Sequence, residues 1–156
     1  MSTYNRNAAV KYARQFALNP NPNFYHFGGI GGDCTNFISQ CLLAGGAIMQ
    51  YSPSGWFYNS SYDRSPSWTS VKELQKFLLN FSIGGPKASI VTLSEIEIGD
   101  IIQLKQNPIR FNHTVIVTEI RQGEIYVCAH SNDALDRPLS SYNFIELMPL
   151  HILQGN

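Results

Sequence analysis

The stretch Phe27-Gly28-Gly29-Ile30-Gly31-Gly32-Asp33-Cys34-Thr35-Asn36-Phe37-Ile38-Ser39-Gln40 places a cysteine between a glycine-rich turn and an amphipathic helix. The glycines allow a sharp turn and let a substrate approach the backbone closely. Free N–H groups and the positive end of the dipole at a helix N-terminus stabilise a thiolate, and the same N–H groups can bind an oxyanion. Cys34 is therefore a candidate nucleophile, with a buried structural cysteine as the alternative.

The helix that follows is expected over residues 33–44. Its apolar residues recur at helical spacing as one stripe, made of Cys34, Phe37, Ile38, Cys41, Leu42 and Gly45. The polar residues Thr35, Asn36, Ser39 and Gln40 fall on the other side. Gly45-Gly46 is a strong C-terminal stop. Cys34 is thus expected at the upper end of the face that packs on the core.

Two more helices and several strands are expected. A helix over residues 7–18 has Asn5 as its cap, and another starts after Thr69 or Ser70 and ends before Gly84-Gly85-Pro86. Residues 47–69 are aromatic-rich without periodicity. Strands are expected over residues 101–104, 113–120, 125–129 and 145–153, the last as a sheet edge because it contains Pro149. Helices followed by strands predict an α+β fold in a single domain, residues 1–156.

Composition limits the function. The charged fraction is 14%, the formal net charge is zero and no run of basic residues occurs, so nucleic acid is not an expected partner. No apolar run is long enough for a membrane span. The N-terminus lacks a secretory leader. We therefore expect a chain that stays in the cytoplasm until it is released, or a domain of a larger cell-wall-acting protein.

The three cysteines do not suggest a disulfide framework. Cys34 and Cys41 lie seven residues apart on one helix, about 10 Å along its axis, which is beyond disulfide reach. Cys128 falls in a strand pattern. No CxxC or HxxxH spacing supports a structural zinc site, and no cofactor is expected.

A nucleophilic cysteine needs a base, and two histidines lie at matching ends of the predicted hairpin. Period two places His113 and Val115 on one face, and His130 and Asn132 together on the neighbouring strand. A turn at residues 122–123 sets His113 opposite Asn132, and a turn at residues 121–122 sets it opposite His130.

Motifs along nearly the whole chain carry a resemblance. They are residues 4–10 (YNRNAAV), 32–42 (GDCTNFISQCL), 44–46 (AGG), 55–58 (GWFY), 67–69 (SWT), 98–102 (IGDII), 112–118 (NHTVIVT), 129–131 (AHS) and 136–137 (DR). In these motifs the chain resembles the bacterial putative-amidase family of papain-like cysteine hydrolases, which is related to the NlpC-type and CHAP-type peptidoglycan hydrolases.

The resemblance implies a papain-like fold, with N-terminal helices packed on an antiparallel β-sheet. It makes Cys34 the nucleophile and His113 the general base. His130 is the first choice for the residue that orients His113, Asn132 the second and Asp133 the third. The position of papain's oxyanion glutamine holds Gly28, so Tyr25 is the expected substitute.

Further residues are candidates for contact with the substrate. They are Gly32 and Asp33 beside the thiol, with Asp33 also a candidate helix cap, and Trp56 and Trp68, which offer rings for stacking. The implied substrate is bacterial peptidoglycan, cleaved at an amide bond.

Three alternatives stay open at this point. In place of an amide hydrolase, the chain is expected to be a non-catalytic wall-binding module with the same fold, an acyl transferase, or a metal-binding protein. The metal-binding alternative would use Cys34, His113, His130 and Cys128. The oligomeric state is not predicted.

Overall fold

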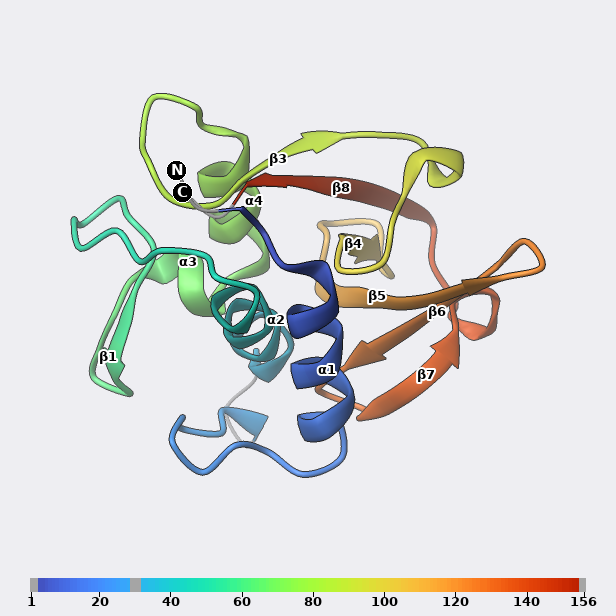
Figure 1. Cartoon of the computed structure of the whole chain (residues 1–156), viewed down its shortest axis with the longest axis horizontal. Coiled ribbons are helices and arrows are strands. Elements are labelled where there is room, and N and C mark those ends of the chain that lie inside the picture. The colour runs from blue at the N-terminus through green and yellow to red at the C-terminus, as the bar shows by residue number, and fades with distance from the viewer. Residues whose placement is uncertain (1–2, 29–31, 155–156) are drawn as a thin grey trace.

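A computed structural model describes residues 3–28 and 32–154 (Figure 1). The helices are α1 (Arg6–Phe16), α2 (Asp33–Ala44), α3 (Pro66–Thr69) and α4 (Val71–Leu79), with short 3₁₀ turns at Leu93–Glu95 and Leu139–Ser141. The strands are β1 (Tyr58–Ser60), β2 (Asp63–Arg64), β3 (Lys87–Ile90), β4 (Ile101–Lys105), β5 (His113–Arg121), β6 (Glu124–Ala129), β7 (Ala134–Pro138) and β8 (Glu146–Gln154).

The main sheet has the strand order β3-β8-β4-β5-β6-β7, and every neighbouring pair is antiparallel. Helices α1 and α2 pack on one face of it (Figure 1). Phe37 and Leu42 of α2 share a core there with Ile116 of the sheet, and the other face buries a smaller cluster around Val115 and Val117. The predicted α+β class, with helices on an antiparallel sheet, is confirmed.

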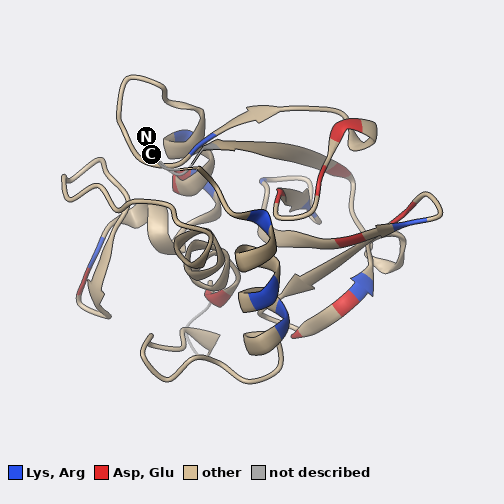
Figure 2. Cartoon of the chain, in the orientation of Figure 1, with Lys and Arg blue, Asp and Glu red and all other residues tan. Residues whose placement is uncertain are grey.

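The charged residues of both signs are spread over these elements (Figure 2). None of the helices in the described part of the chain has the length and apolar content needed to span a bilayer.

Local signals fix the first two helices closely. The Asn5 side chain accepts a hydrogen bond from the N–H of Ala8, as a cap should, and α1 then ends at Phe16, two residues before the expected end. Helix α2 has the predicted bounds. Its polar side, however, does not face solvent, because every residue from Asp33 to Leu42 is buried. That side is buried by hydrogen-bonded neighbours, as when Ser39 donates to the carbonyl of Trp68.

The aromatic-rich segment packs on this polar side. Trp56 and Trp68 have no exposed surface, and their indole N–H groups donate to Ser39 and Asn36 of α2 at 3.0 and 2.9 Å. The expectation that Trp56 and Trp68 contact substrate is therefore wrong: both rings belong to the core, where their N–H groups already have partners.

The last strand was expected at a sheet edge, and it lies in the interior between β3 and β4. Pro149 is tolerated because the pairing of β3 with β8 ends at Leu150, while the Pro149 carbonyl still accepts from the N–H of Val91. Strand β3, which covers this edge, was not predicted.

The β5–β6 hairpin turns at Gln122 and Gly123, both with positive φ, as one of the two predicted registers requires. An irregularity between Val117 and Glu119 then shifts the pairing by one residue, so that Ile116 faces Cys128. Strand β6 ends at Ala129. Because the register is shifted and β6 ends before it reaches these residues, neither Asn132 nor His130 stands opposite His113.

Candidate active site

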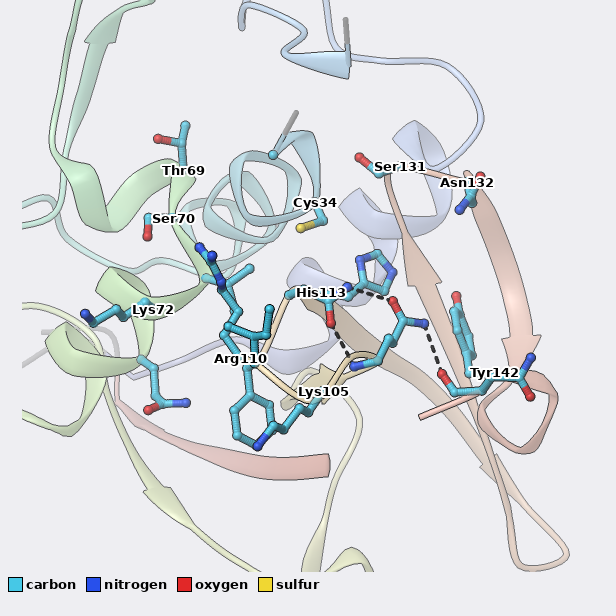
Figure 3. A pocket seen from close by; sticks show the side chains of 18 of the residues that line it. Cys34, Thr69, Ser70, Lys72, Lys105, Arg110, His113, Ser131, Asn132 and Tyr142 are labelled. Carbon is cyan, nitrogen blue, oxygen red and sulfur yellow. Dashed lines mark hydrogen bonds between the residues drawn. The ribbon is translucent and has the colours of Figure 1, made fainter. Parts of the chain in front are cut away.

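A cavity of about 1030 Å³ opens at the end of the sheet where α2 begins (Figure 3). Its wall includes Gly32 and Cys34 from the start of α2, and His113 from the start of β5. The start of α4, the loop between β4 and β5, the turn between β6 and β7, and the segments around Arg137 and Tyr142 form the rest of the wall. The structure therefore brings the predicted nucleophile and the predicted base into one cavity.

A hydrogen bond between the residues that follow Cys34 and His113 helps to hold this pair in place. The hydroxyls of Thr35 and Thr114 lie 3.2 Å apart, which ties the first turn of α2 to the start of β5. Each threonine directly follows one of the two candidate residues in the chain. Cys34 is 3% exposed and His113 is 7% exposed, so both side chains reach the cavity from largely buried positions.

The structure changes the expected charge of Cys34. Burial raises the pKa of the thiol, the N–H of Thr114 and the hydroxyl of Thr35 offset part of this effect, and the charge of Asp33 adds to it. The pKa of Cys34 thus lies above its usual value. This shift favours the thiol over the resting thiolate that the helix terminus predicts, because burial and a neighbouring carboxylate disfavour a charged sulfur.

The pKa of His113 shifts the other way. Burial and the nearby charge of Arg137 lower it to about 4. At neutral pH the cavity thus holds a thiol and an uncharged imidazole, not a thiolate–imidazolium pair. Such a pair can still act if the imidazole takes the proton while the sulfur attacks.

His130, the first choice for orienting His113, has other partners. Its Nδ1 lies 2.6 Å from Oδ2 of Asp33, and its Nε2 lies 2.8 Å from the carbonyl oxygen of Phe16. Burial by itself lowers the pKa of His130, but the bonds to Asp33 and Phe16 raise it overall. Since both partners are acceptors, both ring nitrogens carry protons and His130 is an imidazolium.

Asp33 is the buried counter-ion of this imidazolium. Burial alone raises the pKa of Asp33, but hydrogen bonds from His130, from the N–H of Phe27 and from Asn36 together lower it. Asp33 is 1% exposed and does not cap α2, whose N-cap is Gly32. The expected roles of Asp33 as a cap and in substrate contact are therefore wrong; it joins the end of α1 to the start of α2 through His130.

The other orienting candidates are exposed. Asn132 lines the cavity with Ser131, and both have positive φ in the turn that follows β6, so the expected strand does not continue to them. Asp133 follows in the same exposed turn. Among residues 3–28 and 32–154, no side chain hydrogen-bonds to the His113 ring.

Tyr142 packs beside His113, with ring centroids 6.0 Å apart, and also lines the cavity. Its hydroxyl is the one buried side-chain polar atom without a partner in the described part of the chain.

Of the remaining expected substrate contacts, Gly32 lines the cavity and Tyr25 does not. Tyr25 is half exposed and packs against Phe27, with its backbone bonded to Tyr58 and Asn36. Gly29 and Gly31 of the glycine turn lie outside the described residues. No pattern in the sequence points to the remaining charged or aromatic cavity residues, because they come from four separate segments; these residues are Lys72, Lys105, Arg110, Arg137 and Tyr142.

The predicted metal set is not brought together. Across the described ranges, the group that places three or more potential ligand atoms near one another is His26, Asp33 and His130. His26 lies 3.4 Å from the Asp33 carboxylate and is half exposed. Because both nitrogens of His130 are used as donors, this group is a hydrogen-bonded cluster in which His130 has no lone pair for a metal.

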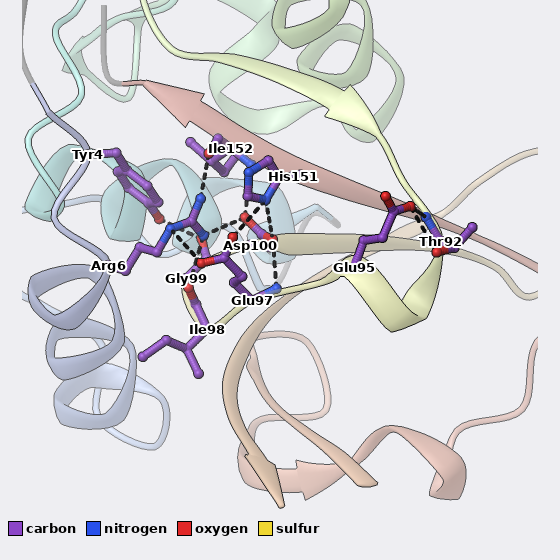
Figure 4. A network of polar contacts seen from close by, with 10 residues as sticks. All are labelled: Tyr4, Arg6, Thr92, Glu95, Glu97, Ile98, Gly99, Asp100, His151 and Ile152. Carbon is purple, nitrogen blue, oxygen red and sulfur yellow. Dashed lines mark hydrogen bonds and ion pairs between the residues drawn. The ribbon is translucent and has the colours of Figure 1, made fainter. Parts of the chain in front are cut away.

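The fourth histidine belongs to a separate network (Figure 4). Asp100 is fully buried and accepts from Arg6 at 2.6 Å and from the N–H of Ile152 at 2.9 Å. His151 lies 2.9 Å from the same carboxylate. Arg6 also donates to the carbonyl of Ile152, so this network ties α1 to β8 and takes no part in the cavity.

The fold and the site together define an α+β domain that presents a buried cysteine and histidine at the mouth of one cavity. Residues 3–153 match the family described as "Putative amidase domain", and the chain belongs to that family.

Two relatives come from Bacillus subtilis strain 168. The chain is 38% identical over 126 residues to the uncharacterized protein YhbB and 32% identical over 145 residues to the uncharacterized protein YjcM. The matches cover 78% and 86% of this chain but 39% and 32% of those proteins, so the chain spans well under half of either relative. No solved structure matches.

Proposed function

We propose that the protein is a papain-like cysteine hydrolase of amide bonds, with Cys34 as nucleophile and His113 as general base. The observation that carries this proposal is the placement of both side chains in one cavity, at the start of α2 and of β5. Membership of an amidase family agrees with this chemistry.

The charges of the site suggest the order of events. His113 is uncharged at neutral pH, so it accepts the thiol proton as the sulfur of Cys34 attacks the amide carbon. The same proton then goes to the leaving amine, and an acyl-enzyme remains. Water, deprotonated by His113, releases the acid and restores the thiol.

The start of α2 is the candidate oxyanion site. Its N-cap, Gly32, has φ 88° and provides no side-chain cap, so the first-turn N–H groups keep their capacity to donate to a ligand. A side chain at residue 32 would both strain this conformation and approach the cavity.

The proposed substrate is bacterial peptidoglycan. The support is the resemblance of the motifs around Cys34 and His113 to cell-wall hydrolases. The bond joins either muramic acid to alanine or two residues of a stem peptide or cross-bridge.

Digestion of purified peptidoglycans of several cross-link types, with mass analysis of the fragments, tests this function. Cys34→Ala and His113→Ala should each abolish fragment release while keeping the circular dichroism spectrum. Cys128→Ala is the matched control, because it removes another buried thiol that does not line the cavity. Undiminished release by Cys34→Ala would refute the mechanism, and release of amine-linked products in added amine would indicate a transferase.

A further inference from the structure

The cavity around Cys34 and His113 is lined by charges of one sign. Four of its residues are cationic, namely Lys72, Lys105, Arg110 and Arg137, and the residues described along its wall include no aspartate or glutamate. The whole chain has 11 residues of each sign. The net charge of the chain is therefore zero although this cavity is positively charged. The sequence does not predict this charge, because the four cations are spread from residue 72 to residue 137.

The cations of the cavity also differ from several cations elsewhere in the chain, because within residues 3–28 and 32–154 they form no ion pair with a carboxylate. Outside the cavity, four cations form ion pairs with carboxylates: Arg6 with Asp100, Arg14 with Asp136, Lys76 with Glu73, and Arg121 with Glu119. Figure 2 shows such opposite charges near one another along the β5–β6 hairpin. Among the described residues, no carboxylate pairs with any of the four cations of the cavity.

The four cations stand on different parts of the wall. Lys72 comes from the first turn of α4, and Lys105 and Arg110 come from the end of β4 and the loop after it (Figure 3). Arg137 comes from β7, where its guanidinium lies 3.7 Å from the centre of the Tyr142 ring and its Nε donates to Ser141. The positive charge is therefore on both the α4 side and the β7 side of the cavity.

The one carboxylate next to Cys34 does not offset this charge. Asp33 is 1% exposed and is paired with the His130 imidazolium at 2.6 Å. Like charges gathered at a concave surface repel one another and attract anions, and the attraction is stronger there than on an open surface.

We propose that the substrate of this cavity is an anionic amide, namely a peptide segment with carboxylates on both sides of the scissile bond. This inference rests on the proposed function. Lys72 and Arg110 bind the carboxylate on the α4 side, and Arg137, which is held by Tyr142 and Ser141, binds the one on the β7 side. A guanidinium with a fixed plane suits a carboxylate, since two N–H groups can donate in parallel.

Binding of two matched peptides to the Cys34→Ala variant tests the proposal without turnover. One peptide carries glutamate on both sides of a central amide bond, and the other carries glutamine at the same two positions. We expect about tenfold tighter binding of the glutamate peptide at low salt, and loss of most of this preference in 0.5 M NaCl.

The double substitution Lys72→Gln and Arg110→Gln should weaken binding of the glutamate peptide several-fold and leave the glutamine peptide unchanged. Lys76→Gln is the matched control on the same helix, because Lys76 pairs with Glu73 and does not line the cavity. It should change neither affinity.

Equal affinities for the two peptides would overturn the proposal. So would a loss caused equally by the Lys76 control. Turnover by the unsubstituted protein separates the two ideas: cleavage of both peptides at equal kcat/KM supports the hydrolase and refutes the anionic preference. Preferential binding of the glutamate peptide, with no cleavage of it or of peptidoglycan, supports the preference and refutes the hydrolase.

Discussion

Replacement of His113 by glutamine should remove a specific pH dependence of stability. The folded protein lowers the pKa of His113 from 6.5 to about 4, so the unfolded chain takes up this proton as the pH falls through 6.5 while the folded chain resists it until about pH 4. Where the unfolded state binds more protons, stability decreases as the pH falls. In the wild type this stability is thus present above pH 6.5 and is lost as the pH falls toward 4.

The size of the effect follows from the same shift. Each pH unit inside the window costs up to about 1.4 kcal/mol, so the wild type should lose about 2 kcal/mol between pH 7 and pH 5 through His113 alone. His113→Gln cannot take up this proton and should not show this loss. The contributions of Asp33 and His130 are common to both proteins and cancel in the difference.

Urea unfolding of both proteins at pH 7, 6, 5 and 4.5 measures the difference. The free energy of unfolding of the wild type should fall relative to that of the variant by about 2 kcal/mol from pH 7 to pH 5. Nuclear magnetic resonance titration of the His113 ring should show no protonation above pH 5. Parallel curves for the two proteins, or a ring that titrates near pH 6.5, would refute the buried, uncharged base.

Three further predictions concern other charges. Alkylation of Cys34 by iodoacetamide should be slow at pH 6 and rise about tenfold per pH unit toward pH 9, because burial raises the pKa of the thiol; fast labelling at pH 6, located by mass spectrometry, would contradict this. His130→Asn leaves the Asp33 carboxylate buried without its counter-ion and should lower the free energy of unfolding in urea by about 3–5 kcal/mol at pH 7; a loss under about 1 kcal/mol would count against the ion pair. Arg6→Met removes the guanidinium from buried Asp100, which keeps His151 at 2.9 Å, and should lower the melting temperature by more than about 8 °C. An unchanged melting curve would show that the network is not needed.

Elements with local signals could be predicted from the sequence. Helix α2 begins and ends where the glycines on either side of it predict, and the hairpin turns at Gln122 and Gly123, because capping and turn chemistry act within a few residues. The placement of Cys34 and His113 in one cavity also agrees with the sequence, since each stands at the end of an element with a strong pattern.

Features that depend on distant partners could not be predicted. The irregularity between Val117 and Glu119 shifts the register of β5 on β6 by one residue, and period two carries no sign of it. The interior position of β8 depends on strand β3, whose four residues are too few for a clear pattern. The partner of His130 is Asp33, which lies 97 residues earlier in the chain, so no local rule joins them.

The charge of the site shows why position alone was insufficient. A helix terminus favours a thiolate when water or a cation faces it, but here Cys34 is 3% exposed and its nearest charged neighbour in the chain is Asp33, so the thiol is the stable form. Arg137 likewise favours the uncharged form of His113, which leaves the base free to accept a proton. If an anionic substrate pairs with Arg137, that influence weakens and the pKa of His113 rises while the substrate is bound. Together with burial, Arg137 would then keep the base unprotonated before binding and let it become more basic when the amide is in place.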